Sequence, residues 1–143
     1  MLLGTYEHSI DEKGRVTVPA KYRTRYEAGV VITEGIERCL LLFPVEVWTE
    51  LAEKAGSLPL TYTTALEFRR QFLGSASHSV PDRQGRVTLP PDLREYANLE
   101  GQAVFIGMHT YCEIWDPEIR RERRAEGDVD DEARVRGYAS LGI

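Results

Sequence analysis

The segment Asp-Glu-Lys-Gly-Arg-Val-Thr-Val-Pro-Ala-Lys-Tyr-Arg occupies residues 11–23, and Asp-Arg-Gln-Gly-Arg-Val-Thr-Leu-Pro-Pro-Asp-Leu-Arg occupies residues 82–94. Seven of the thirteen positions are identical, whereas ordinary amino-acid usage would give roughly one match. A His-Ser-aliphatic triplet precedes each segment, beginning at His8 and at His78. A repeat of this kind indicates two copies of one structural unit that pack together and present the same surface twice.

Polar and apolar residues alternate after the glycine of each copy, which predicts a half-buried strand. The apolar positions are expected to face a core; they are Val16, Val18, Val87 and Leu89. The outward positions are then Arg15, Thr17, Arg86 and Thr88.

Each repeated strand is expected to follow another strand, over residues 3–10 in the first copy and 76–80 in the second. Gly14 and Gly85 lie between the paired strands and allow the positive φ of a tight connection. Pro19 and Pro90 end the repeated strands and open helical turns, predicted over residues 20–26 and 91–96.

The rest of each half is predicted to contain strands followed by helix. Apolar runs at residues 30–32 and 103–106 continue the sheet, and Cys39 of the first half matches Cys112 of the second. Helical spacing predicts helices after Pro44, over 63–73, over 118–126 with an interruption at Gly127-Asp128, and over 130–138. The expected fold is therefore α+β with a mainly β core, made of units 1–75 and 76–143.

Composition indicates an ordinary globular protein. The 143 residues are 42% apolar and 29% charged, a balance that suits one compact domain or two small ones sharing a core. No apolar run approaches the roughly 20 residues that span a bilayer, and no secretory leader is evident. Two cysteines are too few for a disulfide framework. We therefore expect a cytoplasmic protein with no membrane partner.

The formal net charge of −5 does not favour a nucleic-acid partner, but the charge is unevenly distributed. Residues 11–25 carry five basic and two acidic side chains, and residues 82–94 carry three basic and two acidic ones. The acids concentrate at residues 128–132. Cations around the two motifs that are available for phosphate contacts are Lys13, Lys21, Arg23, Arg25, Arg83 and Arg94. Ordinary solvated surface is the alternative for each of them taken singly.

The Asp-x-x-Gly-Arg pattern places opposite charges four residues apart around each turn. The carboxylates of Asp11 and Asp82 can accept hydrogen bonds from loop amides or orient the guanidinium groups of Arg15 and Arg86. A turn-stabilising ion pair alone is one interpretation of this pattern. Packing does not require an outward arginine twice, however, and arginine offers a planar donor fork that suits phosphates and the major-groove edge of guanine.

These paired motifs, together with the opening Leu-Leu-Gly-Thr-Tyr-Glu-His, resemble the bacterial MraZ family over nearly the whole chain. The resemblance implies two SpoVT/AbrB-type units interlaced in a swapped-hairpin barrel with peripheral helices. It also implies a nucleoid-associated transcriptional regulator of the division and cell-wall gene cluster, which binds repeated promoter boxes as a ring-shaped homo-oligomer. The family motif residues fall on Asp11, Arg15, Asp82 and Arg86. The second copy departs from the first at two places. Gln84 stands where the first copy has Lys13, and Pro81 is interpreted as one residue inserted before the second motif.

Other function classes have weaker support. The sequence lacks phosphate-binding and nucleophile-elbow motifs, so no enzyme, cofactor or small-molecule substrate is expected. His8, His78, Cys39 and Cys112 lack close metal-binding spacing, so the histidines are interpreted as partly buried and no metal is expected. The runner-up function is an antitoxin-like protein-interaction module. Two features stay open. A basic cluster at residues 120–124 lies either on a solvated or oligomer-facing helix or at DNA. An apolar stripe at Trp48, Leu51 and Ala52 is interpreted as core or subunit interface, with a ligand-binding box as the alternative.

Overall fold

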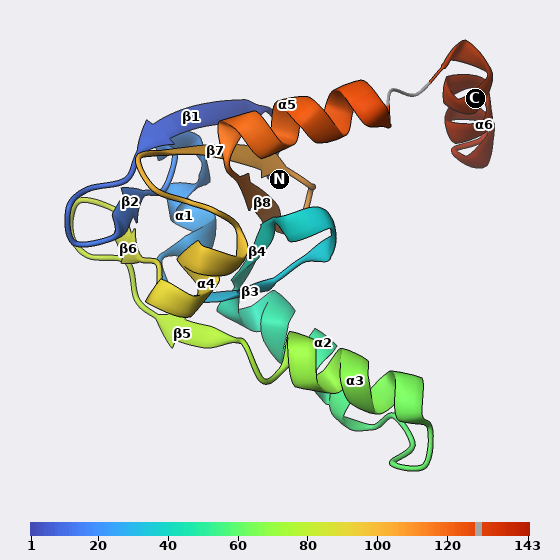
Figure 1. The fold of residues 1–143 in the computed structure, drawn as a ribbon, viewed down its shortest axis with the longest axis horizontal. Helices are drawn as coiled ribbons and strands as arrows, with labels where there is room; N and C mark the ends of the chain where they lie inside the picture. The colour runs from blue at the N-terminus through green and yellow to red at the C-terminus, as the bar shows by residue number, and fades with distance from the viewer. Residues whose placement is uncertain (128–129) are drawn as a thin grey trace.

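A six-stranded antiparallel sheet forms the centre of the computed structural model, which describes residues 1–127 and 130–143 (Figure 1). The strand order is β1-β7-β8-β4-β3-β5, and a separate two-stranded ribbon pairs β2 with β6. The strands are β1 (Thr5–Ser9), β2 (Arg15–Thr17), β3 (Val30–Glu34), β4 (Leu40–Pro44), β5 (Ser77–Ser79), β6 (Arg86–Thr88), β7 (Gln102–Gly107) and β8 (Cys112–Trp115). The predicted α+β class with a mainly β core is confirmed. Within the described residues, β1 and β5 are open sheet edges, so no continuous ladder closes the barrel.

Apart from the short η2, which the sequence did not predict, the helices lie at the predicted positions, within one or two residues of the expected ends. They are η1 (Ala20–Tyr22), α1 (Arg23–Tyr26), η2 (Ile36–Arg38), α2 (Val45–Gly56), α3 (Thr63–Phe72), α4 (Pro91–Tyr96), α5 (Pro117–Glu126) and α6 (Asp131–Ser140). Gly127 ends α5 as predicted, whereas Asp128 lies outside the described residues. The α2–α3 hairpin projects away from the sheet (Figure 1).

The two halves of the chain are interlaced. Of the six strand pairings among the described residues, four join one half to the other: β1 with β7, β5 with β3, β4 with β8, and β2 with β6. The pairings inside a half are those of the hairpins β3–β4 and β7–β8. Because each half supplies edge strands to the other, the halves share one hydrophobic core.

The repeated strands face that core as the alternation predicts. Val16 and Val18 are 1% and 0% exposed, and Val87 and Leu89 are 2% and 0% exposed. All four belong to one cluster with Phe105 and the other buried side chains. Burial of these side chains anchors the β2–β6 ribbon against the rest of the fold.

A second apolar layer covers the other face of β3 and β4. Phe72 of α3 lies 4.8 Å from the Trp48 ring and 6.1 Å from the Phe43 ring. Trp48 of the predicted apolar stripe therefore packs within the chain, against α3 and the sheet.

Two sequence matches between the halves are off by one residue. His8 pairs with core residue Ala103, but the residue that pairs with core residue Val30 is Ser79, not His78. His78 therefore faces away from the core and is exposed, so its predicted partial burial is wrong, whereas His8 is half-buried. With Ser79 matched to His8, Pro81 takes the place of Ile10 and is not an insertion.

The cysteines show the same shift. Leu40 pairs with Ile114, and Leu42 pairs with Cys112. These two pairs mirror each other across the β4–β8 junction, so Cys112 occupies the place of Leu40. Cys39 lies one residue before β4. Sequence identity favoured the wrong match because it counts residue types, whereas the fold repeats the inward and outward faces of strands.

Candidate nucleic-acid interface

The first motif forms a turn around the Asp11 carboxylate. Asp11 Oδ1 accepts the backbone N–H groups of Lys13 and Arg15 at 2.9 Å each, and Oδ2 accepts the Arg15 Nε–H at 2.8 Å. Gly14 donates its N–H to the Asp11 carbonyl at 2.9 Å and has φ +76°. Glycine is favoured at this position because an L side chain at positive φ costs about 1–2 kcal/mol.

The second motif repeats this geometry. Asp82 Oδ1 accepts the N–H groups of Gln84 and Arg86 at 2.9 Å each, and Oδ2 accepts the Arg86 Nε–H at 2.7 Å. Gly85 has φ +77°. The departure at Gln84 leaves the turn unchanged, because only the backbone of that residue is used. We call residues 11–15 and 82–86 the two turn tips.

Pairing of β2 with β6 places the outward side chains of both copies on one face. Arg15 lies opposite Thr88, and Thr17 lies opposite Arg86, while Val16 opposes Val87 on the core side. The two arginines are thus diagonal neighbours across the ribbon, with backbone positions roughly 7–8 Å apart. The ribbon presents a two-fold-symmetric outward face, made of Arg15, Thr17, Arg86 and Thr88.

Each aspartate holds its arginine by the inner part of the guanidinium. Arg15 and Arg86 are bonded through Nε, and within residues 1–127 and 130–143 no partner holds their terminal amino groups. Their side chains are 28% and 32% exposed. The backbone N–H groups of Arg15 and Arg86 are the main cause that lowers the pKa of Asp11 and of Asp82, respectively. The two carboxylates therefore stay ionised at neutral pH and fix the orientation of the arginine side chains.

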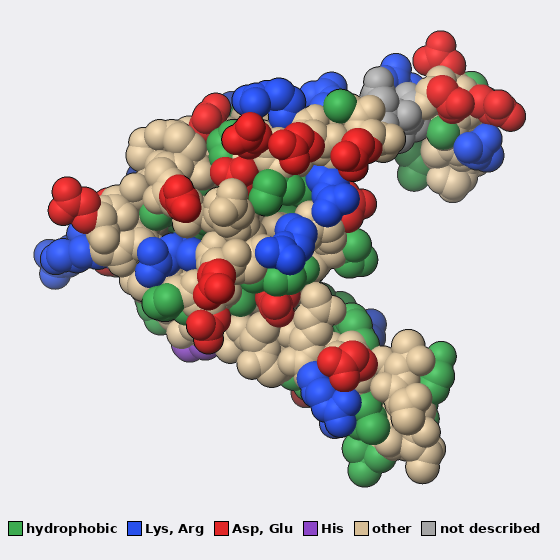
Figure 2. All heavy atoms as spheres, viewed as in Figure 1, with side chains coloured by type: hydrophobic (Ala, Val, Ile, Leu, Met, Phe, Trp, Pro, Cys, Tyr) green, Lys and Arg blue, Asp and Glu red, His purple; other side chains and the backbone are tan. Residues whose placement is uncertain are grey.

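The other predicted site cations divide into two groups. Lys13 and Arg83 are exposed on the turn tips themselves, and Figure 2 shows cationic side chains at the end of the molecule where the β1–β2 and β5–β6 loops lie. Arg23 and Arg94 instead donate their Nε–H groups to backbone carbonyls of the chain. Sequence reasoning did not find this internal role.

Two basic residues beside the first motif lie outside the tips. Arg25 forms an ion pair with Glu46 of α2 at 2.6 Å, so it serves a helix contact. Lys21 is exposed on η1.

Comparison with known proteins identifies the family. A family model described as "MraZ protein, putative antitoxin-like" matches residues 1–71 and 72–121, one match for each half. The chain is 48% identical to the "Transcriptional regulator MraZ" of Thermomicrobium roseum over 118 residues, which cover 82% of this chain and 83% of that relative. The chain belongs to the MraZ family.

Further relatives carry the same name. Identity is 48% to the protein of Herpetosiphon aurantiacus, with 82% of each chain covered, and 42% to that of Caldanaerobacter subterraneus, with 92% of each chain covered. Membership of MraZ confirms the resemblance drawn from the paired motifs. The MraZ relatives are named as regulators of transcription, so the chain falls in a non-enzymatic family, as the sequence predicted.

The cysteines are buried thiols in this MraZ member. Burial raises the pKa of both Cys39 and Cys112 to about 12, which keeps them protonated. Among the described residues, no group of three or more His, Cys, Asp or Glu side chains could hold a metal ion. The same residues include no helix long and apolar enough to cross a bilayer.

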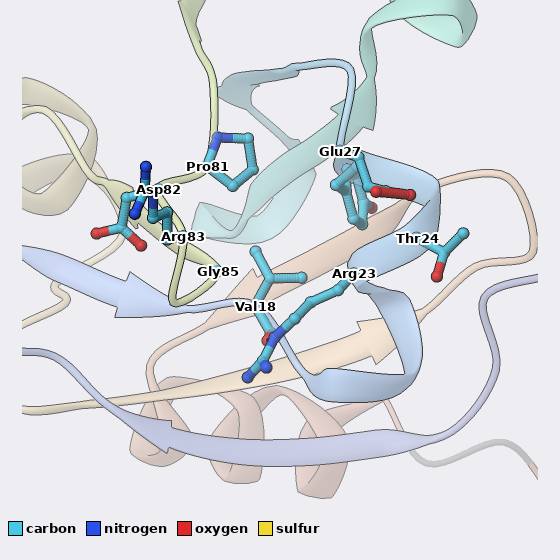
Figure 3. A pocket seen from close by; sticks show the side chains of 9 residues that line it. Val18, Arg23, Thr24, Glu27, Pro81, Asp82, Arg83 and Gly85 are labelled. Atoms are coloured by element: carbon cyan, nitrogen blue, oxygen red, sulfur yellow. The ribbon is translucent and has the colours of Figure 1, made fainter.

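A cavity of about 400 Å³ lies beside the second turn tip (Figure 3). Arg23 and Arg83 line it together with Asp82 and Glu27. Its charges are mixed, so it does not form a site for one sign of ligand. The basic cluster of α5 lies elsewhere: Arg120 stacks over the Trp115 ring at 5.4 Å, and Arg123 pairs with Glu126.

Proposed function

We propose that this chain is a DNA-binding transcriptional regulator that uses the outward face of the β2–β6 ribbon to recognise base sequence. The observation that carries the proposal is the placement of Arg15, Thr17, Arg86 and Thr88 on one face. A two-stranded ribbon fits the major groove, where an arginine fork bonds guanine O6 and N7 and threonine contacts several base edges.

The turn tips supply the remaining contacts. Lys13 and Arg83 approach the phosphates on either side of the groove, and Asp11 and Asp82 orient the two base-reading arginines. Two-fold symmetry of the face suits a short site with two similar half-sites. Arg23 and Arg94 lie behind the tips and donate to backbone carbonyls of the chain, so they are not assigned a DNA contact.

Self-association completes the proposed mechanism. A homo-oligomeric ring would present many ribbons to repeated promoter boxes, and each added contact would gain from a high effective concentration. This would offset the acidic net charge of −5. Support comes from apolar side chains that are exposed in the single chain: Leu60, Tyr62, Phe68, Val135, Tyr138 and Leu141. As targets we propose promoter boxes of the division and cell-wall gene cluster, which the family resemblance implies, bound at the nucleoid in the cytoplasm.

The deciding experiment measures binding to a labelled duplex from upstream of the gene for this chain, and to a scrambled duplex, across a salt series. Arg15→Ala and Arg86→Ala should each weaken specific binding about 10- to 100-fold and reduce discrimination between the duplexes. Lys13→Ala should weaken both duplexes alike and lower the salt slope by about one. Arg70→Ala on α3 is the matched control, because Arg70 is exposed and forms its ion pair with the neighbouring Glu67 of the same helix. Wild-type affinity in a double variant that combines Arg15→Ala with Arg86→Ala would remove the ribbon from the mechanism.

An antitoxin-like interaction module is the second candidate, and the description of the matching family model favours it. In that case the Arg15 and Arg86 variants would bind DNA as the wild type does, and a stoichiometric protein partner would co-purify. Light scattering gives the mass of the assembly; a monomer at high protein concentration would argue against the ring.

A further inference from the structure

We infer that Arg23 and Arg94 are reciprocal positioning residues: each arginine comes from one half of the chain and holds the turn tip of the other half. The inference rests on the proposed DNA-binding role of the tips, but its geometry stands on contacts inside the chain. It changes the expected role of these two cations from phosphate contact to support of the opposite motif.

Arg23 of α1 lies against the second turn tip. A β-carbon built on Gly85 would lie 2.6 Å from Arg23 Nε and 2.9 Å from its Cδ, so the arginine side chain already fills the space above that glycine. Arg23 Nε–H donates to the Val18 carbonyl at 3.1 Å, and the Val18 N–H donates to the Gly85 carbonyl at 2.8 Å. Figure 3 shows the Arg23 side chain reaching from its helix toward Val18 and Gly85.

Arg94 of α4 repeats the arrangement on the first turn tip. A β-carbon on Gly14 would lie 2.8 Å from Arg94 Cζ and 2.9 Å from its Nε. Arg94 Nε–H donates to the Leu89 carbonyl at 2.9 Å, and the Leu89 N–H donates to the Gly14 carbonyl at 2.8 Å. The last identical position of the repeat, the arginine at 23 and 94, thus has a structural role that the local sequence does not reveal.

This geometry requires arginine. The Nε–H lies in mid side chain and reaches the strand carbonyl, while the flat guanidinium covers a glycine of the other half. Lysine keeps the charge but has neither the mid-chain donor nor the flat surface. The glycines are required for a second reason besides their positive φ, since a side chain there would displace the arginine.

Amide hydrogen exchange on the full chain tests the inference without DNA. In Arg23→Lys, the amides of residues 84–86 should exchange about tenfold faster, while those of residues 13–15 keep their wild-type rates. Arg94→Lys should give the reverse pattern. The Phe105 amide in the sheet reports global stability, so each rate is taken relative to it. Arg25→Lys, on the same helix as Arg23 but paired with Glu46, is the control and should change neither tip.

Faster exchange in the tip of the same half, in both tips equally, or in neither would overturn the inference. A DNA arm then tests its consequence. Arg23→Lys and Arg86→Ala should combine less than additively, because both act at the second tip, whereas Arg23→Lys and Arg15→Ala should add. The salt slope of Arg23→Lys should equal that of the wild type. Each arginine variant could speed exchange only in the tip of the opposite half and yet lose no DNA affinity. That result would support the positioning role and count against the proposed function alone.

Discussion

At the two turn tips the halves of the molecule are nearly the same: Asp11 and Asp82 accept equivalent hydrogen bonds whose lengths differ by at most 0.1 Å. On the outer faces of the sheet they differ. The first half packs Phe43 against the aromatic side chains of the α2–α3 hairpin, whereas the second half places Trp115 under an arginine of α5. Each tip is held by an arginine of the other half, Arg94 at the first tip and Arg23 at the second. The α2–α3 hairpin and α5 lie away from the tips (Figure 1), so they can differ between the halves without altering the tip geometry.

The largest expected effect comes from separating the halves. Fragments 1–75 and 76–143 should each be unfolded as monomers, because each loses the strands that pair across the junction. Either fragment should fold only by pairing with a second chain, so its melting temperature should rise with concentration, and mixing should give a stable heterodimer. Circular dichroism melting measures this. A monomeric fragment that melts cooperatively at a concentration-independent temperature would break the picture of one shared core.

A substitution at the glycine of each tip tests their equivalence. Gly14→Ala and Gly85→Ala should each lower the free energy of unfolding by about 2 kcal/mol, from positive φ and from the overlap with an arginine. Urea denaturation measures the loss. Gly56→Ala is the control, because an added β-carbon there meets no described atom within 4 Å. Losses that differ by more than about 1 kcal/mol would show that the tips are not supported alike.

The β3–β4 turn of the first half and the β7–β8 turn of the second half also differ in backbone conformation. Glu37 and Arg38 both have positive φ in the β3–β4 turn, whereas His109 alone does so in the β7–β8 turn. Glu37→Gly should raise the free energy of unfolding by about 0.5 kcal/mol, because relief of strain exceeds the added entropy of the unfolded chain. Thermal denaturation measures the gain. Ile36→Gly, at a residue without positive φ, should not stabilise the protein; equal gains would refute strain as the cause.

The smallest effect concerns the histidine that only the first half carries in its inward position. Burial, with a smaller contribution from Arg23, lowers the pKa of His8 below its usual 6.5. Below about pH 6.5 the unfolded chain therefore binds more protons at this site, and stability falls as the pH drops toward the lowered pKa. In His8→Gln this part of the slope should vanish. In His78→Gln, at the exposed histidine, this part of the slope should persist. Loss of the slope in His78→Gln would show that His78 also faces inward, as the sequence match implied.

Local rules account for the parts that the sequence predicted well. Alternation placed Val16 and Val87 inside, proline and glycine marked the ends of strands and helices, and the Asp-x-x-Gly-Arg pattern predicted both turns. Each of these features depends on residues only a few positions apart. The candidate site followed for the same reason, since Arg15 and Arg86 lie on outward strand positions next to a turn.

Register and distant contacts escaped prediction. The matches of His78 with His8 and of Cys39 with Cys112 were wrong by one residue, because pairing in the sheet depends on which side chains face the core. The ion pair between Arg25 and Glu46, and the packing of Arg23 on Gly85, join residues far apart in the chain. Local patterns carry no signal for such contacts.

By itself the sequence determined that two equal turn-and-strand units exist, which residues of the two repeated strands face inward, and where the α-helices lie, because these features arise from backbone preference and periodicity over a few residues. Only the tertiary structure decided that β2 pairs with β6, so that two arginines and two threonines share one face. It also decided that each half supports the tip of the other. These outcomes depend on long-range strand pairing around a shared core, where burial of apolar surface selects one register among several that the local sequence permits.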